Sequence, residues 1–121
     1  LMNPCAGKSL LVTSYTHPEY AVSMAETLAL MQANALLLRG TEGESVADAR
    51  RTPKMQGFVY GQSIALQEHQ AGTLATLPEL PLSIDAASTA DYIRQVMDGK
   101  QPVPTPIAHQ VAHILRLVAT L

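Results

Sequence analysis

The hydrophobic and polar positions along the chain predict strands and helices in alternation. An apolar, β-branched stretch at residues 9–15 predicts a first strand. Residues 36–38 are three leucines that run directly into a glycine-rich polar loop, which is the pattern of a buried strand that opens into a loop. The apolar residues between these stretches share helical spacing, and they are Tyr20, Met24, Leu28 and Met31. Strand, helix and strand with short links predict a βαβ unit with a right-handed crossover.

The middle of the chain is less regular. Residues 41–56 predict a polar loop, because they lack any sustained apolar period. Residues 57–60 and 64–68 predict two weak strands, either as edge strands or as a hairpin around Gly61. Residues 72–81 predict a loop, since two prolines there block regular structure.

Polar residues mark where three helices should begin. The expected N-caps, each with the first-turn residue that supports it, are Thr16 with Glu19, Ser88 with Asp91, and Thr105 with Pro106. Asn34 and Gly99 are expected to end the first two helices. The side chains expected to face the core from the second helix are Ile93, Val96 and Met97.

The final helix is apolar around most of its circumference. Such a helix is normally buried on several sides, so it should lie centrally or present a partner surface. Its apolar residues are Ile107, Ala108, Val111, Ala112, Ile114, Leu115, Leu117 and Val118.

Composition indicates one folded domain with a modest core, because 47% of the 121 residues are hydrophobic and only 15% are charged. A net charge of −2 and 4% aromatic residues argue against DNA binding through overall charge or a base-stacking platform, although a local basic patch remains open. Cys5 is the only cysteine, which excludes an internal disulfide and a cysteine zinc cluster and suits a cytoplasmic protein.

No apolar run approaches the length of a membrane span, and the chain shows no signal-peptide pattern. The chain instead starts almost directly with its first strand. We therefore expect it to be a fragment from the end of a longer protein.

The loop after the leucine strand is the best place for a site, because open α/β sheets bind ligands at the C-terminal ends of their strands. Glu42 and Glu44, together with Asp48, could hold Mg²⁺ beside a phosphate ligand. The alternative is an ordinary solvated acidic loop. Arg50, Arg51 and Lys54 come soon after in the chain and could contact phosphates, or they could simply be solvated.

Other candidate chemistry is weaker. His109 and His113 lie four residues apart on the last helix and so share one face, which is the spacing of a two-histidine metal site. No third ligand is evident, and the favoured interpretation is two histidines on the polar edge of a buried helix. The sequence assigns no catalytic residue.

Several stretches together resemble the C-terminal part of the anthranilate phosphoribosyltransferase family, which are glycosyltransferases related to nucleoside phosphorylases. Residues 1–4, LMNP, are similar to the end of the family's GPLxNP segment, and residues 16–19, THPE, match the family's next strand and helix. Residues 36–43, LLLRGTEG, resemble the strand that ends VVHGxDG. Residues 90–121 resemble the closing helix pair.

The departures from that pattern favour one branch of the family. The synthases continue with GLDE, whose Asp-Glu pair binds a second Mg²⁺, but Ser45 and Val46 occupy those places here. Arg39 stands where the family has histidine. These variants look more like the synthase-like paralogues, which are homodimers described as binding nucleic acids.

The resemblance implies that residues 1–121 are the C-terminal α/β segment of an incomplete large domain. That domain would contain a mixed or parallel sheet with flanking helices, a βαβ start and a closing helix pair. The expected partners are the rest of the parent chain, a second copy in a homodimer, and nucleic acid. A first hypothesis is a nucleic-acid-binding paralogue without synthase activity, with phosphates contacted by Arg50, Arg51, Lys54, Arg39 and Lys8.

A second hypothesis is an active transferase that uses phosphoribosyl pyrophosphate and Mg²⁺. Glu42 and Glu44 would then be the remaining metal ligands, and Asn3 and Pro4 would line the acceptor side. A third hypothesis is a segment that supplies only scaffold and interface. In each case we expect no catalysis and no cofactor for this segment alone.

Overall fold

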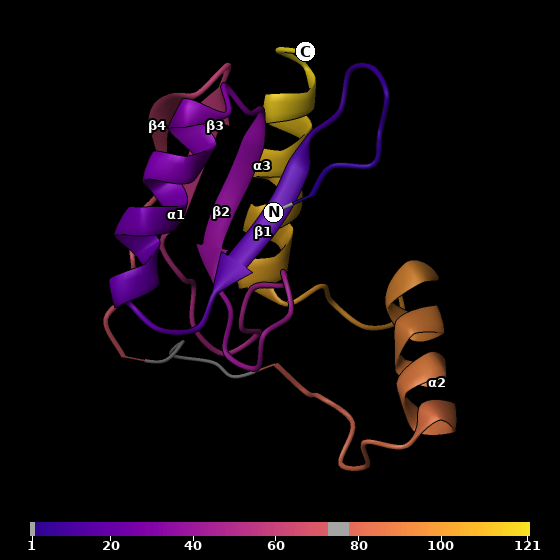
Figure 1. Ribbon diagram of the computed structural model, residues 1–121. Helices are drawn as coiled ribbons and strands as arrows, with labels where there is room; N and C mark the ends of the chain where they lie inside the picture. Colours follow the sequence, from indigo (N-terminus) through magenta and orange to yellow (C-terminus); the bar gives the residue numbers. More distant parts are fainter. Residues whose placement is uncertain (1, 73–77) are drawn as a thin grey trace.

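Four strands form one mixed sheet in the computed structural model, which describes residues 2–72 and 78–121 (Figure 1). The strands lie side by side in chain order, and they are β1 (Leu11–Tyr15), β2 (Ala35–Arg39), β3 (Met55–Val59) and β4 (Gln62–Gln67). β1 and β2 are parallel and are joined by α1 (Glu19–Leu30), whereas the other neighbours are antiparallel. The predicted α/β class, the mixed sheet and the βαβ start are confirmed.

The core lies on both faces of β2. Side chains alternate along a strand, so Leu36 and Leu38 face one side of the sheet and pack with Leu117 of α3 (Thr105–Val118). Leu37 faces the other side and packs with Leu28 of α1. Because both faces of β2 are covered by helices, every position from 35 to 38 is buried, which explains the uninterrupted leucine run.

The hairpin between β3 and β4 is confirmed at Gly61. Tyr60 and Gly61 have φ of 48° and 81°, the left-handed pair that two-residue hairpins require. The Tyr60 N–H donates to Asn34 Oδ1 at 2.9 Å. Asn34 therefore ties the hairpin to the start of β2. The prediction that it caps α1 is wrong, since α1 ends at Leu30 and its C-cap is Met31.

The predicted N-caps are also wrong. The Thr16 hydroxyl contacts Nδ1 of His17 at 2.9 Å, and α1 begins behind Pro18 with no side-chain cap. The N-cap of α3 is Pro104, again without a side-chain cap. Both helices have a proline at the N-cap, and α3 has a second proline in its first turn. The fixed φ of proline favours the start of a helix even where no side-chain hydroxyl accepts a hydrogen bond.

The second helix, α2 (Ala86–Met97), begins three residues earlier than predicted. Its N-cap is Asp85, whose carboxylate accepts a hydrogen bond from the Ser88 N–H at 2.8 Å, so Ser88 is inside the helix. Hydrogen bonds from the Ser83 hydroxyl and then from Ser88 lower the pKa of Asp85 to about 2.

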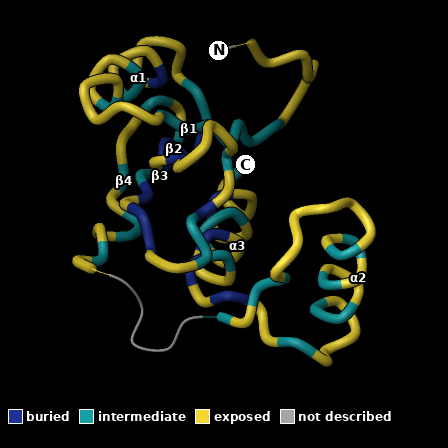
Figure 2. The backbone as a smooth tube through the Cα atoms, turned by 90° about the horizontal axis from the view of Figure 1, so that it is seen from below, coloured by how far each residue is buried: buried dark blue, intermediate teal, exposed yellow. Residues whose placement is uncertain are grey.

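α2 also stands apart from the sheet and from α3 (Figures 1 and 2). None of its described residues is buried, and Ile93 and Met97 are 54% and 81% exposed. The expectation that Ile93, Val96 and Met97 face the core is therefore incorrect for Ile93 and Met97, whereas Val96 is half-buried. Gly99 ends α2 as predicted, with φ of 75°.

Two features complete the description of the chain. Within the described residues, no helix has the length and apolar character needed to cross a membrane. Residues 73–77 of the predicted loop at 72–81, and Leu1 of the LMNP segment, lie outside the described residues.

Candidate phosphate-binding site

Polar side chains from three segments meet where β1 and β2 end. The two strands are parallel and their last residues, Tyr15 and Arg39, are register partners, so the residues that come after them lie at one edge of the sheet. A cavity of about 130 Å³ opens there. It is lined by Thr16, Arg39, Gly40, Thr41, Asp48, Arg51, Pro53 and His69.

A second cavity, of about 210 Å³, adjoins the first and shares Arg39 and His69 with it. Its other lining residues are Tyr15, Pro18, Ala21 and Lys54. The two cavities together collect the side chains of Arg39, Arg51 and Lys54, although Arg39 is distant in the sequence from the other two. We call these three side chains, with His69, the basic cluster.

The segment that carries Arg51 and Lys54 is held beside His69 by paired hydrogen bonds. The Thr52 N–H donates to Oε1 of Gln70 at 3.0 Å, and the Gln70 N–H donates to the Thr52 carbonyl at 3.0 Å. Thr52 is buried, so these bonds are shielded from water. Lys54 then leads directly into β3, which fixes its position relative to the sheet.

The other predicted phosphate contacts lie elsewhere. Arg50 is exposed and lines neither cavity, and its backbone N–H donates to Oδ1 of Asp48 at 2.9 Å. Lys8 lines a separate cavity with Leu11 and Asn34, at the opposite end of β1 and β2. The structure therefore brings Arg39, Arg51 and Lys54 together, but it separates Lys8 and Arg50 from them.

The predicted substrate residues Asn3 and Pro4 are both exposed near Lys8, far along the strands from the basic cluster. The Asn3 amide donates to the Ser9 hydroxyl at 2.7 Å, and its carbonyl oxygen accepts from the Cys5 N–H at 3.0 Å. In this chain the Asn3 side chain thus orders its own loop.

Glu42 and Glu44 are exposed and line neither cavity of the basic cluster. The first cavity is instead lined by the carboxylate of Asp48. Over the described residues, no group of three or more histidine, cysteine, aspartate or glutamate side chains could hold a metal ion.

Gln110 is the residue that sequence reasoning missed. Its side chain is only 5% exposed, its Nε2 donates to the Ser45 carbonyl at 2.8 Å, and its Oε1 accepts from the Ala47 N–H at 2.8 Å. These bonds fasten the loop after β2 to α3, and the next residue in that loop is Asp48. An isolated glutamine among the apolar positions of the last helix was the available signal.

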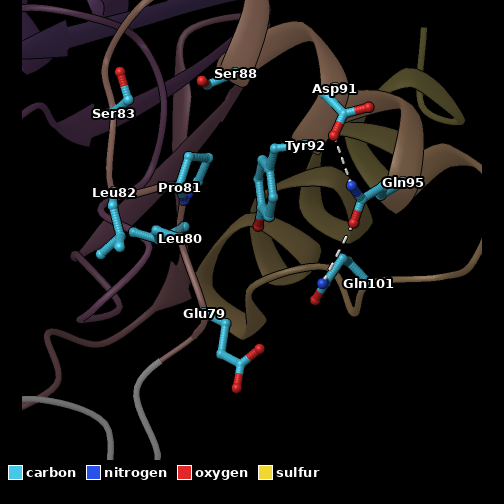
Figure 3. A pocket seen from close by; sticks show the side chains of 10 residues that line it. All are labelled: Glu79, Leu80, Pro81, Leu82, Ser83, Ser88, Asp91, Tyr92, Gln95 and Gln101. Atoms are coloured by element: carbon cyan, nitrogen blue, oxygen red, sulfur yellow. Dashed lines mark hydrogen bonds between the residues drawn. The ribbon is translucent and has the colours of Figure 1, made fainter.

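A cavity beside α2 has different chemistry. It has a volume of about 450 Å³ and lies between α2 and residues 79–83 (Figure 3). Asp91 accepts a hydrogen bond from Gln95 at 2.8 Å, and Gln101 donates to Gln95 at 3.4 Å (Figure 3). Its described lining contains the carboxylates of Glu79 and Asp91 but no cationic side chain, so it does not extend the basic cluster.

The two histidines of α3 differ in environment. Nε2 of His113 lies 3.3 Å from Oε1 of Gln67, whereas His109 is exposed. Burial lowers the pKa of His113, and the nearby charges of Arg116 and His109 lower it further. The polar-edge interpretation of this helix fits His113, which lies between the sheet and solvent.

This environment predicts a pH-dependent stability. The pKa of His113 in the folded chain lies below the ordinary value of 6.5, so the unfolded chain takes up the proton first as pH falls. Stability should therefore be complete above pH 6.5 and decline below it. Urea unfolding from about pH 7.5 to about pH 5 measures this, and His113→Gln should flatten the profile whereas His17→Gln should not. An unchanged profile in His113→Gln would contradict the assignment.

No protein-family profile matches the chain. Over 106 residues it is 32% identical to the uncharacterized protein YbiB of Escherichia coli (strain K12). The match covers 88% of this chain but 32% of the relative, so the chain spans about one third of that protein's length.

Proposed function

We propose that this chain is the phosphate-contacting part of a nucleic-acid-binding protein. The protein would be a cytoplasmic homodimer related to the synthase-like paralogues of the anthranilate phosphoribosyltransferases, and this segment would belong to their phosphoribosyltransferase fold. The observation that carries the proposal is the convergence of Arg39, Arg51 and Lys54 on two adjoining cavities. The cluster forms at the ends of two parallel strands, where α/β sheets bind their ligands.

The chemistry of the basic cluster suits a phosphodiester strand. Arginine presents a planar fork of donors to phosphate oxygens, and lysine adds a point charge. The cavities share Arg39, so consecutive phosphates can occupy neighbouring positions. Tyr15 lines the second cavity and offers one ring against which a base can stack. Binding of this kind depends little on sequence and strongly on salt.

A second candidate function is Mg²⁺-dependent phosphoribosyl transfer, and one observation favours it. The Asp48 carboxylate lies in the wall of the first cavity, beside two arginines that could hold a pyrophosphate. Mg²⁺ is often bound by one or two carboxylates plus phosphate oxygens. Asp48 could therefore be the one protein ligand to a Mg²⁺ ion that pyrophosphate also coordinates. Glu42 and Glu44 do not add to it.

A salt series tests the first proposal. We expect a fluorescein-labelled oligothymidylate to bind the purified protein with an affinity that falls as potassium chloride rises. Each phosphate contact contributes a slope of about −0.7 in log K against log salt on single strands. Combined Arg39→Ala, Arg51→Ala and Lys54→Ala substitutions should flatten the slope by about two, since three contacts are lost.

The matched control removes the same charge elsewhere, through Arg94→Ala, Lys100→Ala and Arg116→Ala, and should leave the slope nearly unchanged. Equal losses in both triple variants would show that only net charge matters and would overturn the proposal. Absence of oligonucleotide binding, combined with Mg²⁺-dependent binding of phosphoribosyl pyrophosphate that Asp48→Asn abolishes, would establish the second candidate instead.

A further inference from the structure

Asp48 is a hydrogen-bond acceptor in a cavity that otherwise supplies cationic donors. The first cavity contains the side chains of Arg39 and Arg51, whose guanidinium N–H groups suit phosphate oxygens. Asp48 lines the same cavity, and an ionised carboxylate accepts hydrogen bonds but donates none. Phosphate oxygens are also acceptors, and their charge is repelled by this carboxylate. A cavity that held only phosphates would therefore bind them more tightly without Asp48.

The position of Asp48 is fixed by hydrogen bonds on both sides of it. The preceding residue, Ala47, is buried, and its N–H donates to Oε1 of Gln110. The Arg50 N–H donates to Asp48 Oδ1 at 2.9 Å, and the Arg51 N–H donates to the Asp48 carbonyl at 3.3 Å. A carboxylate has about four acceptor positions on its two oxygens, so acceptor capacity remains for a ligand.

A sugar hydroxyl is the ligand group that suits this arrangement. The sugar-phosphate backbone of DNA presents acceptors along its length but no hydrogen-bond donor between its ends. RNA adds a 2′-hydroxyl to every sugar, and this group both donates and accepts. A 2′-hydroxyl in the first cavity can donate to Asp48 and accept from an arginine of the same cavity.

The two cavities differ in size and lining in a way that fits the parts of a nucleotide. The first, at about 130 Å³, is slightly smaller than a cavity of about 150 Å³ that holds a benzene ring, so it admits a sugar ring but not a purine. Thr16 and Thr41 also line it. The second, at about 210 Å³, is lined by Tyr15, Pro18 and Ala21, which suit the face of a base.

We infer that Asp48 makes the basic cluster selective for ribose, so that this segment binds RNA more tightly than DNA of the same base sequence. The inference rests on the proposed function, because it specifies which nucleic acid the same site takes. DNA would leave the half-buried Asp48 carboxylate beside phosphates with no backbone donor to accept from. One hydrogen bond to a charged group corresponds to about tenfold or more in affinity.

Oligouridylate and oligodeoxyuridylate of equal length test the inference, because the two strands differ only in the 2′-hydroxyl. Both should bind with an affinity that falls as potassium chloride rises. At one salt concentration, the ribose strand should bind about tenfold more tightly than the deoxyribose strand.

Asp48→Asn keeps an acceptor oxygen for the Arg50 N–H but removes the negative charge. In this variant the ratio of the two affinities should fall to about two or less, chiefly because the deoxyribose strand binds more tightly. Asp48→Ala should lose the selectivity in the same way. Glu42→Gln is the matched control, since it removes a carboxylate of the same loop that lines neither cavity, and it should leave the ratio unchanged.

The outcomes separate this inference from the proposed function. Equal, salt-sensitive binding of the two strands by the unaltered chain would overturn the inference and leave the proposed function intact. An Asp48→Asn variant that tightens both strands by the same factor would also overturn it, because Asp48 would then act only through its charge. If neither strand bound, the proposed function would fail, and this inference with it.

Discussion

Replacing Gln110 with methionine is expected to lower the free energy of unfolding by about 2–4 kcal/mol, because two backbone groups lose their partners. The Gln110 side chain bonds both the Ala47 N–H and the Ser45 carbonyl, and Ala47 is buried. Methionine has nearly the same length and fills the same space, so the loss would come from the hydrogen bonds and not from a cavity. Urea unfolding near neutral pH measures the change.

Two variants refine this result. Gln110→Glu keeps an acceptor for the Ala47 N–H but cannot donate to Ser45, so we expect a loss comparable to that of methionine or larger. His109→Met changes the neighbouring exposed position and should alter stability by less than about 0.5 kcal/mol. A Gln110→Met variant as stable as His109→Met would show that water replaces both bonds, and that α3 does not fasten the loop.

The Gln110→Met variant also tests the proposed nucleic-acid binding. The loop from Ser45 to Ala47 leads into Asp48, which lines the first cavity with Arg51. Loosening it should weaken oligonucleotide binding even though Gln110 lies outside both cavities.

Replacing Gly40 with alanine is expected to reduce oligonucleotide affinity about tenfold or more and to destabilise the chain by about 1–3 kcal/mol. A Cβ atom at Gly40 would lie 2.6 Å from the Glu44 carbonyl oxygen and 3.2 Å from Ser14 Cβ. The backbone oxygen cannot rotate away as a side chain could. The loop would have to move, and with it the wall of the first cavity next to Arg39 and Thr41.

Glu42→Gln is the matched control for Gly40→Ala. It changes an exposed side chain of the same loop that lines neither cavity, so affinity should rise slightly or stay constant. Anisotropy titrations at one salt concentration compare the variants. A Gly40→Ala variant with unchanged affinity would show that the loop after β2 does not contribute to oligonucleotide binding. A large loss of affinity in Glu42→Gln would show that this carboxylate contributes to oligonucleotide binding.

The sequence predicted the sheet better than the helix ends. β2 was recognisable because only a strand covered on both faces tolerates a succession of buried apolar residues such as positions 35–38. The hairpin was recognisable because Gly61 takes up a positive φ without steric cost. The N-caps failed because several polar residues or prolines stood close to each helix start, and local spacing alone could not choose among them.

The candidate site was predicted in part. The sequence singled out Arg39, Arg51 and Lys54, but it could not separate them from Arg50 and Lys8. Nothing in the sequence pattern indicated that Gln70 would form hydrogen bonds with Thr52 and so place His69 beside Arg39. Glu42 and Glu44 come soon after β2, yet the path of the loop carries them outside the cavities.

By itself, the sequence determined the local elements: the buried leucine strand, the βαβ unit, the hairpin and the end of α2 at Gly99. These depend on periodicity and on the conformational preferences of single residues, which act within a few positions along the chain. Only the tertiary structure decided that Arg39, Arg51 and Lys54 share one edge, that Gln110 fastens the loop, and that α2 and the outer face of α3 lack a covering layer among the described residues. Those outcomes depend on packing between distant segments, and no local pattern specifies which surfaces will meet.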